Sequence, residues 1–131
     1  MALTLRIVTP TRVVVDTEVS EVTAPGAAGE LGFLPEHVTF LGELGVGILR
    51  YQERGAGKSV VVHGGYAEVV NDVVTVLADD AELPSEIDGS AARTALSQID
   101  AALTKATDDP AEVDRLLLEH KRAQVRIDAC R

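Results

Sequence analysis

Residues 59–78, SVVVHGGYAEVVNDVVTVLA, form a nearly continuous run of β-branched and apolar residues that is interrupted at two places. Gly64-Gly65 interrupts it first, and glycines inside a strand pattern mark a bend or a bulge. Asn71-Asp72 interrupts it again with a pair that is typical of tight turns. No helical period runs through the segment. The pattern therefore predicts three short strands, at Ser59–His63, Tyr66–Val70 and Val73–Leu77.

The residues before this run repeat the same pattern of strands and turns. From Leu3 to Ile7, apolar residues alternate with polar ones, which is the period of a strand with one face in water, and Pro10 ends it. Further strands are predicted at Val13–Val15, Val19–Ala24, Val38–Leu44 and Val46–Tyr51, with a turn at Gly55–Gly57. Short strands this close together, with no helical period between them, predict an antiparallel sandwich or barrel.

The period changes after Pro84, where β-branched residues become rare and alanine becomes frequent. An apolar stripe with helical spacing follows, and it consists of Ala92, Leu96, Ile99 and Leu103. The change in pattern predicts two domains. Residues 1–84 form an all-β domain, and residues 85–131 form a helical hairpin.

The second helix of this hairpin has a clear start signal. Asp109 is a good cap residue, Pro110 fits the first helical position, and Glu112 has the spacing to reach back to the cap amide. The stripe of this helix is Val113, Leu116, Leu117, His120, Ala123 or Gln124, and Ile127. Two striped helices joined by a short connection predict an antiparallel pair.

The overall charge excludes several classes of protein. The net charge is −9, with no Trp and only four Phe and Tyr residues, so neither a phosphate-binding face nor a base-stacking platform is expected. We therefore expect no nucleic-acid partner.

No apolar run approaches the roughly 20 residues of a membrane span, which favours a cytoplasmic protein without direct membrane insertion. Cys130, the one cysteine, has no internal partner for a disulfide.

Residues 26–37, GAAGELGFLPEH, are predicted to form an ordered loop. Its glycines permit unusual backbone angles, and its apolar residues are too many for a loose linker. Two interpretations remain open on composition. The loop packs over the edge of its own sheet, or it presents Glu30 and Leu31 to a partner.

Catalytic patterns are absent from the sequence. The three histidines, His37, His63 and His120, have no metal-like spacing, and no nucleophile elbow, phosphate-binding loop or CxxC pattern occurs. The paired acids Asp79-Asp80 end a strand with no nucleophile beside them. We expect a chain that is not an enzyme by itself and that holds no metal.

The C-terminal segment is locally basic. Residues 1–84 carry 5 basic and 12 acidic side chains, whereas residues 115–131 carry a net charge of +3. Arg115, Arg122 and Arg126 share one helix face, and we call them the basic strip. The strip is interpreted either as a solvated face or as a docking surface for an acidic partner.

Five motifs in order carry a family resemblance: IVTP at 7–10, PGAAGELGFLPEH at 25–37, GILR at 47–50, GGYAEV at 64–69 and VTVLADDAE at 74–82. The chain resembles the epsilon subunit of bacterial F-type ATP synthases across nearly all of residues 3–82. The resemblance implies a sandwich of about ten short strands in two sheets, followed by a two-helix hairpin.

The same resemblance implies a mechanical role in the central stalk. Its expected partners are the gamma subunit, the membrane c-ring, and the alpha and beta subunits of the catalytic head. The implied location is the cytoplasmic face of the bacterial plasma membrane, as a peripheral part of a proton-translocating complex. The hairpin is expected to extend into the head and inhibit ATP hydrolysis.

The resemblance also assigns site residues. The c-ring contact corresponds to Gly29, Glu30, Leu31 and Gly32, and the gamma contact corresponds to His37. This assignment favours an exposed Glu30 over a loop packed on its own sheet. The family's inhibitory role gives the basic strip a partner, namely acidic residues of the catalytic head.

Some members of the family bind ATP through an (I/L)DxxRA motif on the first helix and basic residues on the second. The nucleotide candidates here are Ile87, Asp88, Arg93, Arg122 and Arg126. Ala91 replaces the motif arginine, and Arg93 lies about 200° further around the helix. We therefore expect no tightly bound cofactor. ATP is at most a weakly bound regulatory ligand, and an ATP-sensing module is the alternative function.

Overall fold

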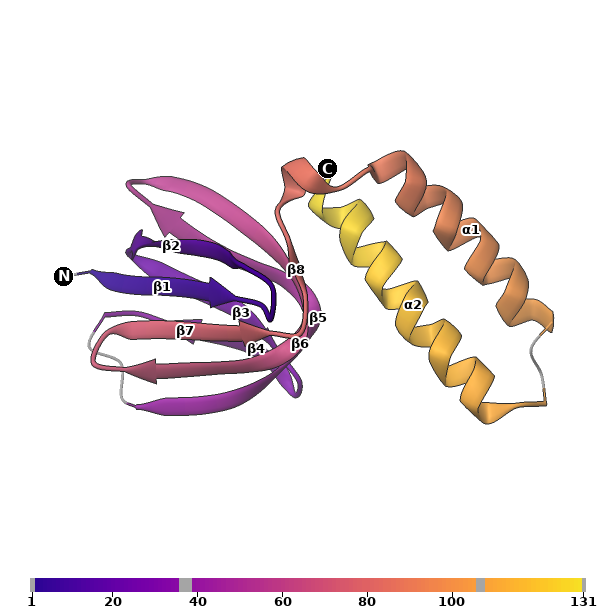
Figure 1. The fold of residues 1–131 in the computed structure, drawn as a ribbon, viewed down its shortest axis with the longest axis horizontal. Coiled ribbons are helices and arrows are strands. Elements are labelled where there is room, and N and C mark those ends of the chain that lie inside the picture. Colours follow the sequence, from indigo (N-terminus) through magenta and orange to yellow (C-terminus); the bar gives the residue numbers. More distant parts are fainter. Residues whose placement is uncertain (1, 36–38, 106–107, 131) are drawn as a thin grey trace. The chain divides into compact units, whose positions relative to one another are not determined.

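The computed structural model describes residues 2–35, 39–105 and 108–130. The chain divides into two compact units, Met1–Leu83 and Pro84–Arg131. The first unit is built from strands and the second from helices (Figure 1).

The described residues of the first unit form eight strands of one hydrogen-bonded sheet. They are β1 (Leu3–Val8), β2 (Val13–Val19), β3 (Glu21–Gly26), β4 (Gly29–Phe33), β5 (Phe40–Glu53), β6 (Ala56–Val70), β7 (Val73–Ala78) and β8 (Ala81–Glu82). The path runs β2-β1-β7-β6-β5-β3-β4, and β8 pairs with β6 beside it. Pairing is antiparallel except between β1 and β7, which are parallel.

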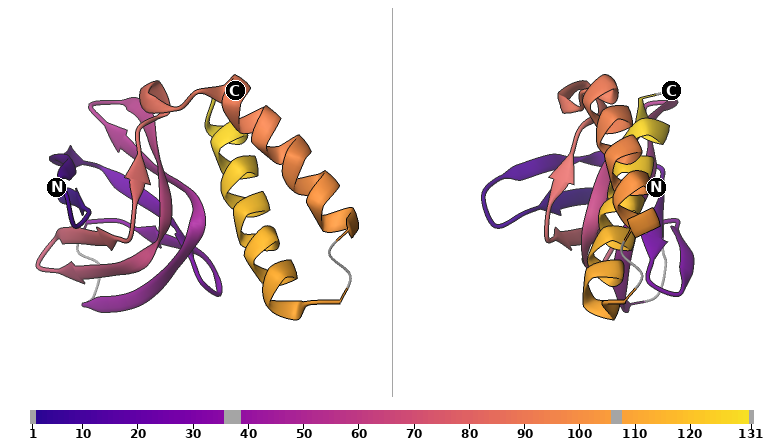
Figure 2. Two further views of the ribbon diagram at one scale, coloured as in Figure 1. Left: turned by 45° about the vertical axis from the view of Figure 1, so that its right-hand side comes forward. Right: turned by 90° about the vertical axis from the view of Figure 1, so that its right-hand side faces the viewer.

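The two longest strands turn this single path into a sandwich. The first half of β5 pairs with the second half of β6 beside β7, whereas the second half of β5 pairs with the first half of β6 beside β3. Each long strand therefore contributes to both layers, and the curvature of β5 and β6 is visible in Figure 2. The two inner faces form the core, with Leu5, Ile7, Leu49, Val60, Val62 and Val74 fully buried.

The expected β sandwich followed by a two-helix hairpin is confirmed. The described residues contain eight strands instead of about ten, because two predicted pairs of strands are each continuous. Val38–Leu44 and Val46–Tyr51 were expected to be separate, but residues 40–53 form β5. Likewise, the predicted break at Gly64-Gly65 is a bend inside β6. Gly64 and Gly65 have φ values of 78° and 119°, which glycine adopts without strain, so pairing continues through the bend.

The prediction of a loop over residues 26–37 is also wrong for half of its length, and its last two residues lie outside the described part of the chain. Gly29–Phe33 forms β4, which pairs with β3 in a hairpin that turns at Ala27-Ala28. Alternation explains the strand, because Phe33 and Leu31 are more buried than Glu30 and Gly32. We call residues 26–33 the β3–β4 hairpin tip.

The second unit contains a short 3-10 turn, η1 (Pro84–Glu86), followed by α1 (Gly89–Lys105) and α2 (Pro110–Ala129). The predicted cap of α2 is confirmed, because the Asp109 carboxylate accepts hydrogen bonds from the amides of Ala111 and Glu112 at 3.0 and 3.5 Å. The expected hydrogen bond between the Glu112 carboxylate and the backbone amide of the cap residue Asp109 is not found. Its carboxylate accepts a hydrogen bond from Arg115 instead.

The two helices pack side by side through most of the predicted stripe. Ala92 on α1 and Leu116, Ala123 and Ile127 on α2 are buried. Leu117 does not belong to this seam, since 52% of its surface is exposed. A helix face about 100° wide cannot include two adjacent residues equally, and Leu116 takes the inner position.

Candidate functional site

Glu30 lies on an exposed edge of the β unit. It follows Gly29 at the β3–β4 hairpin tip, and β4 is the last strand of the sheet path, so one side of β4 has no strand neighbour. A surface hollow of about 380 Å³ adjoins the tip, and both Glu30 and Glu43 line it. Leu31 and Phe40 form its apolar part. The hollow therefore has an apolar wall, and two glutamate residues are among those that border it.

The predicted c-ring residues are thus together at one tip, with Gly29, Glu30 and Gly32 exposed and Leu31 partly buried. Close backbone packing beneath the tip depends on glycine at Gly26. A side chain there would approach the Leu31 Cγ atom to 2.9 Å.

A second candidate surface crosses the outer face of the sheet. Four apolar residues face one another across successive strands: Val13 opposite Val8, Val8 opposite Leu77, and Leu77 opposite Tyr66. Residues directly opposite on paired strands lie on the same face. Val13, Leu77 and Tyr66 are 56%, 54% and 54% exposed, which is high for large apolar residues. We call these four residues the apolar row.

Sequence reasoning missed the apolar row. Val13 comes opposite Val8 only because the register of β1 and β2 shifts by one residue at this point, so the row becomes visible only when the order and register of four strands are known. Leu41, which is 70% exposed on the same face of β5, adds to this surface. His37, the expected gamma contact, lies outside the described residues.

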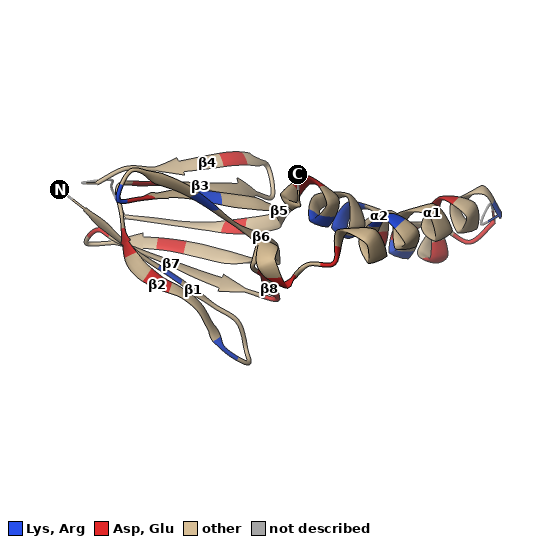
Figure 3. Ribbon diagram, turned by 90° about the horizontal axis from the view of Figure 1, so that it is seen from above, with Lys and Arg blue, Asp and Glu red and all other residues tan. Residues whose placement is uncertain are grey.

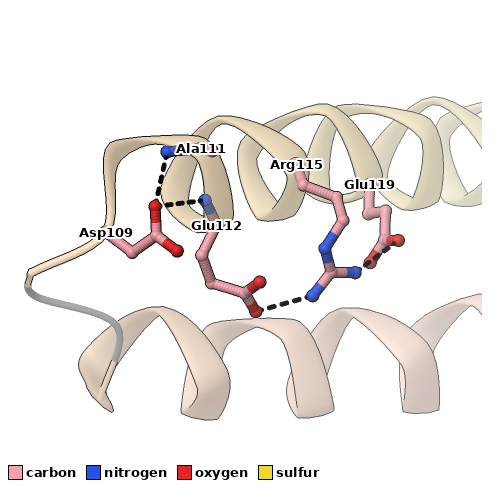
Figure 4. A network of polar contacts seen from close by, with 5 residues as sticks. All are labelled: Asp109, Ala111, Glu112, Arg115 and Glu119. Atoms are coloured by element: carbon pink, nitrogen blue, oxygen red, sulfur yellow. Dashed lines mark hydrogen bonds and ion pairs between the residues drawn. The ribbon is translucent and has the colours of Figure 1, made fainter.

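Arg115, the first member of the basic strip, is engaged on its own helix. Its guanidinium donates to the Glu112 carboxylate at 2.6 Å and to Glu119 at 3.0 Å (Figure 4). The hydrogen bond to Glu112, followed by the two negative charges, raises the pKa of Arg115. Two carboxylates offset one guanidinium, so this part of the strip presents no net positive charge.

The other two members, Arg122 and Arg126, lie in the C-terminal half of α2 and are partly buried. Figure 3 shows the basic positions of the second unit mostly along α2. The basic strip is therefore basic at one end only.

The nucleotide candidates on α1 lie at the open end of the helical hairpin. The Asp88 carboxylate accepts a hydrogen bond from the Ala91 amide at 3.1 Å and caps α1. The Cys130 thiol lies 3.9 Å from the carbonyl oxygen of Ile87. Arg93 is exposed on α1.

The family model of the ATP synthase Delta/Epsilon chain β-sandwich domain matches residues 2–84. The ATP synthase epsilon chain of Synechococcus sp. (strain WH7803) is 41% identical, with 100% of this chain and 98% of that relative covered. The epsilon chain of Solibacter usitatus (strain Ellin6076) is 44% identical, with 95% and 92% covered. This chain belongs to the ATP synthase epsilon chain family.

Solved structures share the fold of this epsilon-family chain. A chain of the Euglena gracilis mitochondrial ATP synthase, in an assembly of OSCP, F1 and c-ring, superposes with a TM-score of 0.86 at 22% identity and covers 99% of this chain and 82% of its own length. A chain of the Tetrahymena thermophila central stalk and c-ring superposes with a TM-score of 0.67 at 14% identity, with 100% and 98% covered. Membership of the family makes this chain a subunit of a complex that performs ATP synthesis and ion transport.

Within residues 2–35, 39–105 and 108–130 of this epsilon-family chain, no three of His, Cys, Asp and Glu come together as a metal site requires. Nor does the described part of either helix combine the length and apolarity needed to cross a membrane. His63 on β6 is 3% exposed, and its Nε2 atom lies 2.7 Å from the Glu82 carboxylate on β8, which ties the last strand to the sheet.

Proposed function

We propose that this chain is a non-catalytic rotor subunit in the central stalk of a bacterial, proton-translocating F-type ATP synthase. In this role it transmits c-ring rotation through the gamma subunit, and its C-terminal helices inhibit ATP hydrolysis. One observation carries the proposal. The β unit presents exposed surface of two different chemistries, the apolar row and the acidic β3–β4 hairpin tip, which adjoin where Glu43 on β5 lies opposite Tyr66 on β6. A rotor coupling subunit needs two such surfaces, one for each neighbour.

The apolar row is assigned to the gamma subunit. A contact that transmits torque must stay closed, and apolar area removed from water stabilises an interface by roughly 25 cal/mol per Å². Tyr66 and Leu77 lie side by side with more than half of their surface exposed, so they form the centre of the row. The row therefore has the character of a buried interface core rather than of a free surface.

The β3–β4 hairpin tip is assigned to the c-ring. Glu30 and Glu43 line one hollow, so a basic or amide side chain from a ring loop finds acceptors there. A rigid hairpin holds the Glu30 carboxylate better than a loop does, because β4 is hydrogen-bonded to β3 along its length, and Glu43 lies on β5, which also pairs with β3. This contact places the chain on the cytoplasmic face of the plasma membrane as a peripheral subunit.

The helical hairpin is assigned to inhibition through contacts with the alpha and beta subunits. Glu112 and Glu119 offset Arg115 on its own helix, so Arg115 contributes little to the electrostatic part of that contact. Exposed ion pairs contribute roughly 0 to 1 kcal/mol each, so inhibition is partial and sensitive to salt.

ATP is at most a weak regulatory ligand in this proposal. Ala91 provides no guanidinium, and the Asp88 carboxylate caps α1. Losing a charged hydrogen bond costs about 1.5 to 3 kcal/mol, or roughly a tenfold to hundredfold loss of affinity. Calorimetry with the full chain tests this. Binding of ATP tighter than about 10 μM would favour the sensing function instead.

The decisive test of the rotor role is binding to gamma. Leu77→Asp places a charge at the centre of the apolar row and is expected to weaken gamma binding by about tenfold or more. Leu34→Asp is the matched control, because Leu34 is 58% exposed and lies outside the row. Equal binding by the parent and both variants would remove the row from the interface.

A further inference from the structure

We infer that Tyr66, Glu43 and Glu68 form a binding site for an arginine side chain of the gamma subunit. The inference rests on the proposed function, because it names the chemical group that gamma presents beside the apolar row. Glu43 on β5 lies directly opposite Tyr66 on β6, and Glu68 follows two residues later on β6. All three exposed side chains therefore project from the same face of the sheet. We call these three residues the acidic cradle.

In the described part of the chain, neither carboxylate of the acidic cradle forms an ion pair or a side-chain hydrogen bond. Glu43 and Glu68 are diagonal neighbours on paired strands, at a spacing of about 7 to 8 Å, so their negative charges repel each other. Arg6 lies on the same face, but Thr75 of β7 separates it from Glu68. The Arg6 Nε atom lies 3.7 Å from the Asp16 Oδ2 atom instead. The acidic cradle therefore carries two uncompensated negative charges.

Apolar side chains surround these charges. Tyr66 and Leu77 lie opposite each other and are each 54% exposed. Leu41, which lies opposite Glu68 on β5, is 70% exposed. A partner that covers the apolar row therefore also removes Glu43 and Glu68 from water. Burying a carboxylate without a positive partner is costly, so the covering surface must supply a cation at this point.

Arginine fits the acidic cradle better than lysine does. Its planar guanidinium offers five N–H donors in a fixed fork, which can reach carboxylates on two sides. The same plane stacks on aromatic rings, and the ring of Tyr66 is available for this contact. An ammonium group is a compact and strongly hydrated point charge. The arginine contact fixes the register of gamma on the β unit, whereas the apolar row supplies the buried area.

Binding of the full chain to the purified gamma subunit of the same complex tests the inference. Glu68→Lys reverses one charge and is expected to weaken binding by about thirtyfold or more. Glu68→Gln keeps the size of the side chain, and a loss of about tenfold is expected. Glu18→Lys is the matched control, because Glu18 is exposed on the same face and lies opposite Thr4, four residues before Val8 of the row. It is expected to bind within about twofold of the parent.

Charge exchange identifies the group on gamma. In combination with Glu68→Lys, the surface arginines of gamma are replaced by glutamate one at a time, and one replacement is expected to recover about tenfold in affinity. The surface lysines of gamma are replaced in the same way and are expected to give no recovery. Recovery at a lysine alone, or at no position, would overturn the assignment to arginine.

Failure of the inference is distinguishable from failure of the proposed function, which Leu77→Asp tests. Weak binding by Leu77→Asp with parent-like binding by both Glu68 variants would overturn the acidic cradle and leave the rotor role in place. Parent-like binding by Leu77→Asp as well would remove both. Glu43→Gln is a second variant on another strand, and it reports on gamma alone because the assay contains no c-ring. It is expected to bind about as weakly as Glu68→Gln.

Discussion

Tyr51 is a polar side chain placed in the core of the β unit. It lies on β5 and is only 6% exposed. Burial raises the pKa of Tyr51, with the nearby charge of Lys58 acting in the opposite direction and Glu53 adding to the rise. The folded state therefore holds the phenolic proton more tightly than the unfolded chain does. The stability linked to this proton is complete below the unfolded pKa of about 10 and is lost as the pH rises through the folded value.

Replacing Tyr51 by phenylalanine should remove this loss of stability at alkaline pH. We expect the free energy of unfolding of Tyr51→Phe to stay within about 1 kcal/mol of the parent value at pH 7, because the hydroxyl group of Tyr51 keeps its proton at that pH. Above pH 10 the variant should lose less stability than the parent. Urea unfolding at pH 7, 9, 10 and 11 measures the difference. Tyr66→Phe is the control, since Tyr66 is exposed, and an equal effect of both substitutions would contradict the assignment to Tyr51.

Gly65 permits the bend in β6 that lets this strand serve both layers. Its φ of 119° is strained for any other residue, and a side chain at this position would collide with the carbonyl oxygen of Leu77 on β7. Gly65→Ala is expected to destabilise the β unit by about 3 kcal/mol or more, as measured by urea unfolding.

Gly32→Ala provides the comparison for this substitution. Its added methyl group meets nothing within 4 Å, so a change within about 0.5 kcal/mol is expected. Similar losses for both variants would mean that backbone strain at Gly65 is unimportant.

At the scale of elements, α2 depends on its cap. The Asp109 carboxylate accepts from two amides that no helical partner satisfies. Asp109→Ala is expected to cost about 0.5 to 2 kcal/mol of helix stability, seen as faster amide exchange in the first turns of α2. Asp108→Ala removes an adjacent exposed acid and should have a much smaller effect. An unchanged exchange pattern in Asp109→Ala would contradict the capping role.

Elements with local signals were predictable from the sequence. Pro10 ends a strand, Asn71-Asp72 adopts the positive φ values of a tight turn, and Asp109-Pro110 starts a helix, and each effect involves only neighbouring residues. The two-unit organisation rests on the same kind of signal, because the hydrophobic period changes after Pro84. Local chemistry therefore accounts for most of the element boundaries.

Elements that depend on distant partners were not predictable in the same way. The bend at Gly64-Gly65 looks like a strand break in the sequence, and only the pairing of β6 with β5 and β7 shows that the strand continues. In β4, Gly29 and Gly32 conceal a strand whose inner positions are Leu31 and Phe33. The apolar row needs the register of four strands, so sequence reasoning had no means of finding it.

At the scale of the whole molecule, Glu30 is an exposed acid that we expect to couple this chain to the c-ring. Reversing the charge by Glu30→Lys leaves the core untouched, because Glu30 is exposed at the β3–β4 hairpin tip. We expect proton pumping per ATP hydrolysed by the reconstituted complex to fall by about two- to fivefold, the range of a lost exposed ion pair.

The control for this substitution is Glu21→Lys, which makes the same change of charge at the other end of β3. Assembly of the complex is verified for both variants before pumping is measured. If Glu30→Lys pumps as well as Glu21→Lys and the parent, then Glu30 does not belong to the coupling contact.

The parallel pairing of β1 with β7 imposes an order on the synthesis of this chain. Leu5 lies beside Val74, about 70 residues later, so the first strand made has no neighbour on that side until nearly the whole β unit has left the ribosome. Until then, β1 and β2 form an isolated hairpin, which is marginally stable in water. The β unit therefore completes its sheet late, and a chain released before Val73 leaves an open strand edge that invites aggregation.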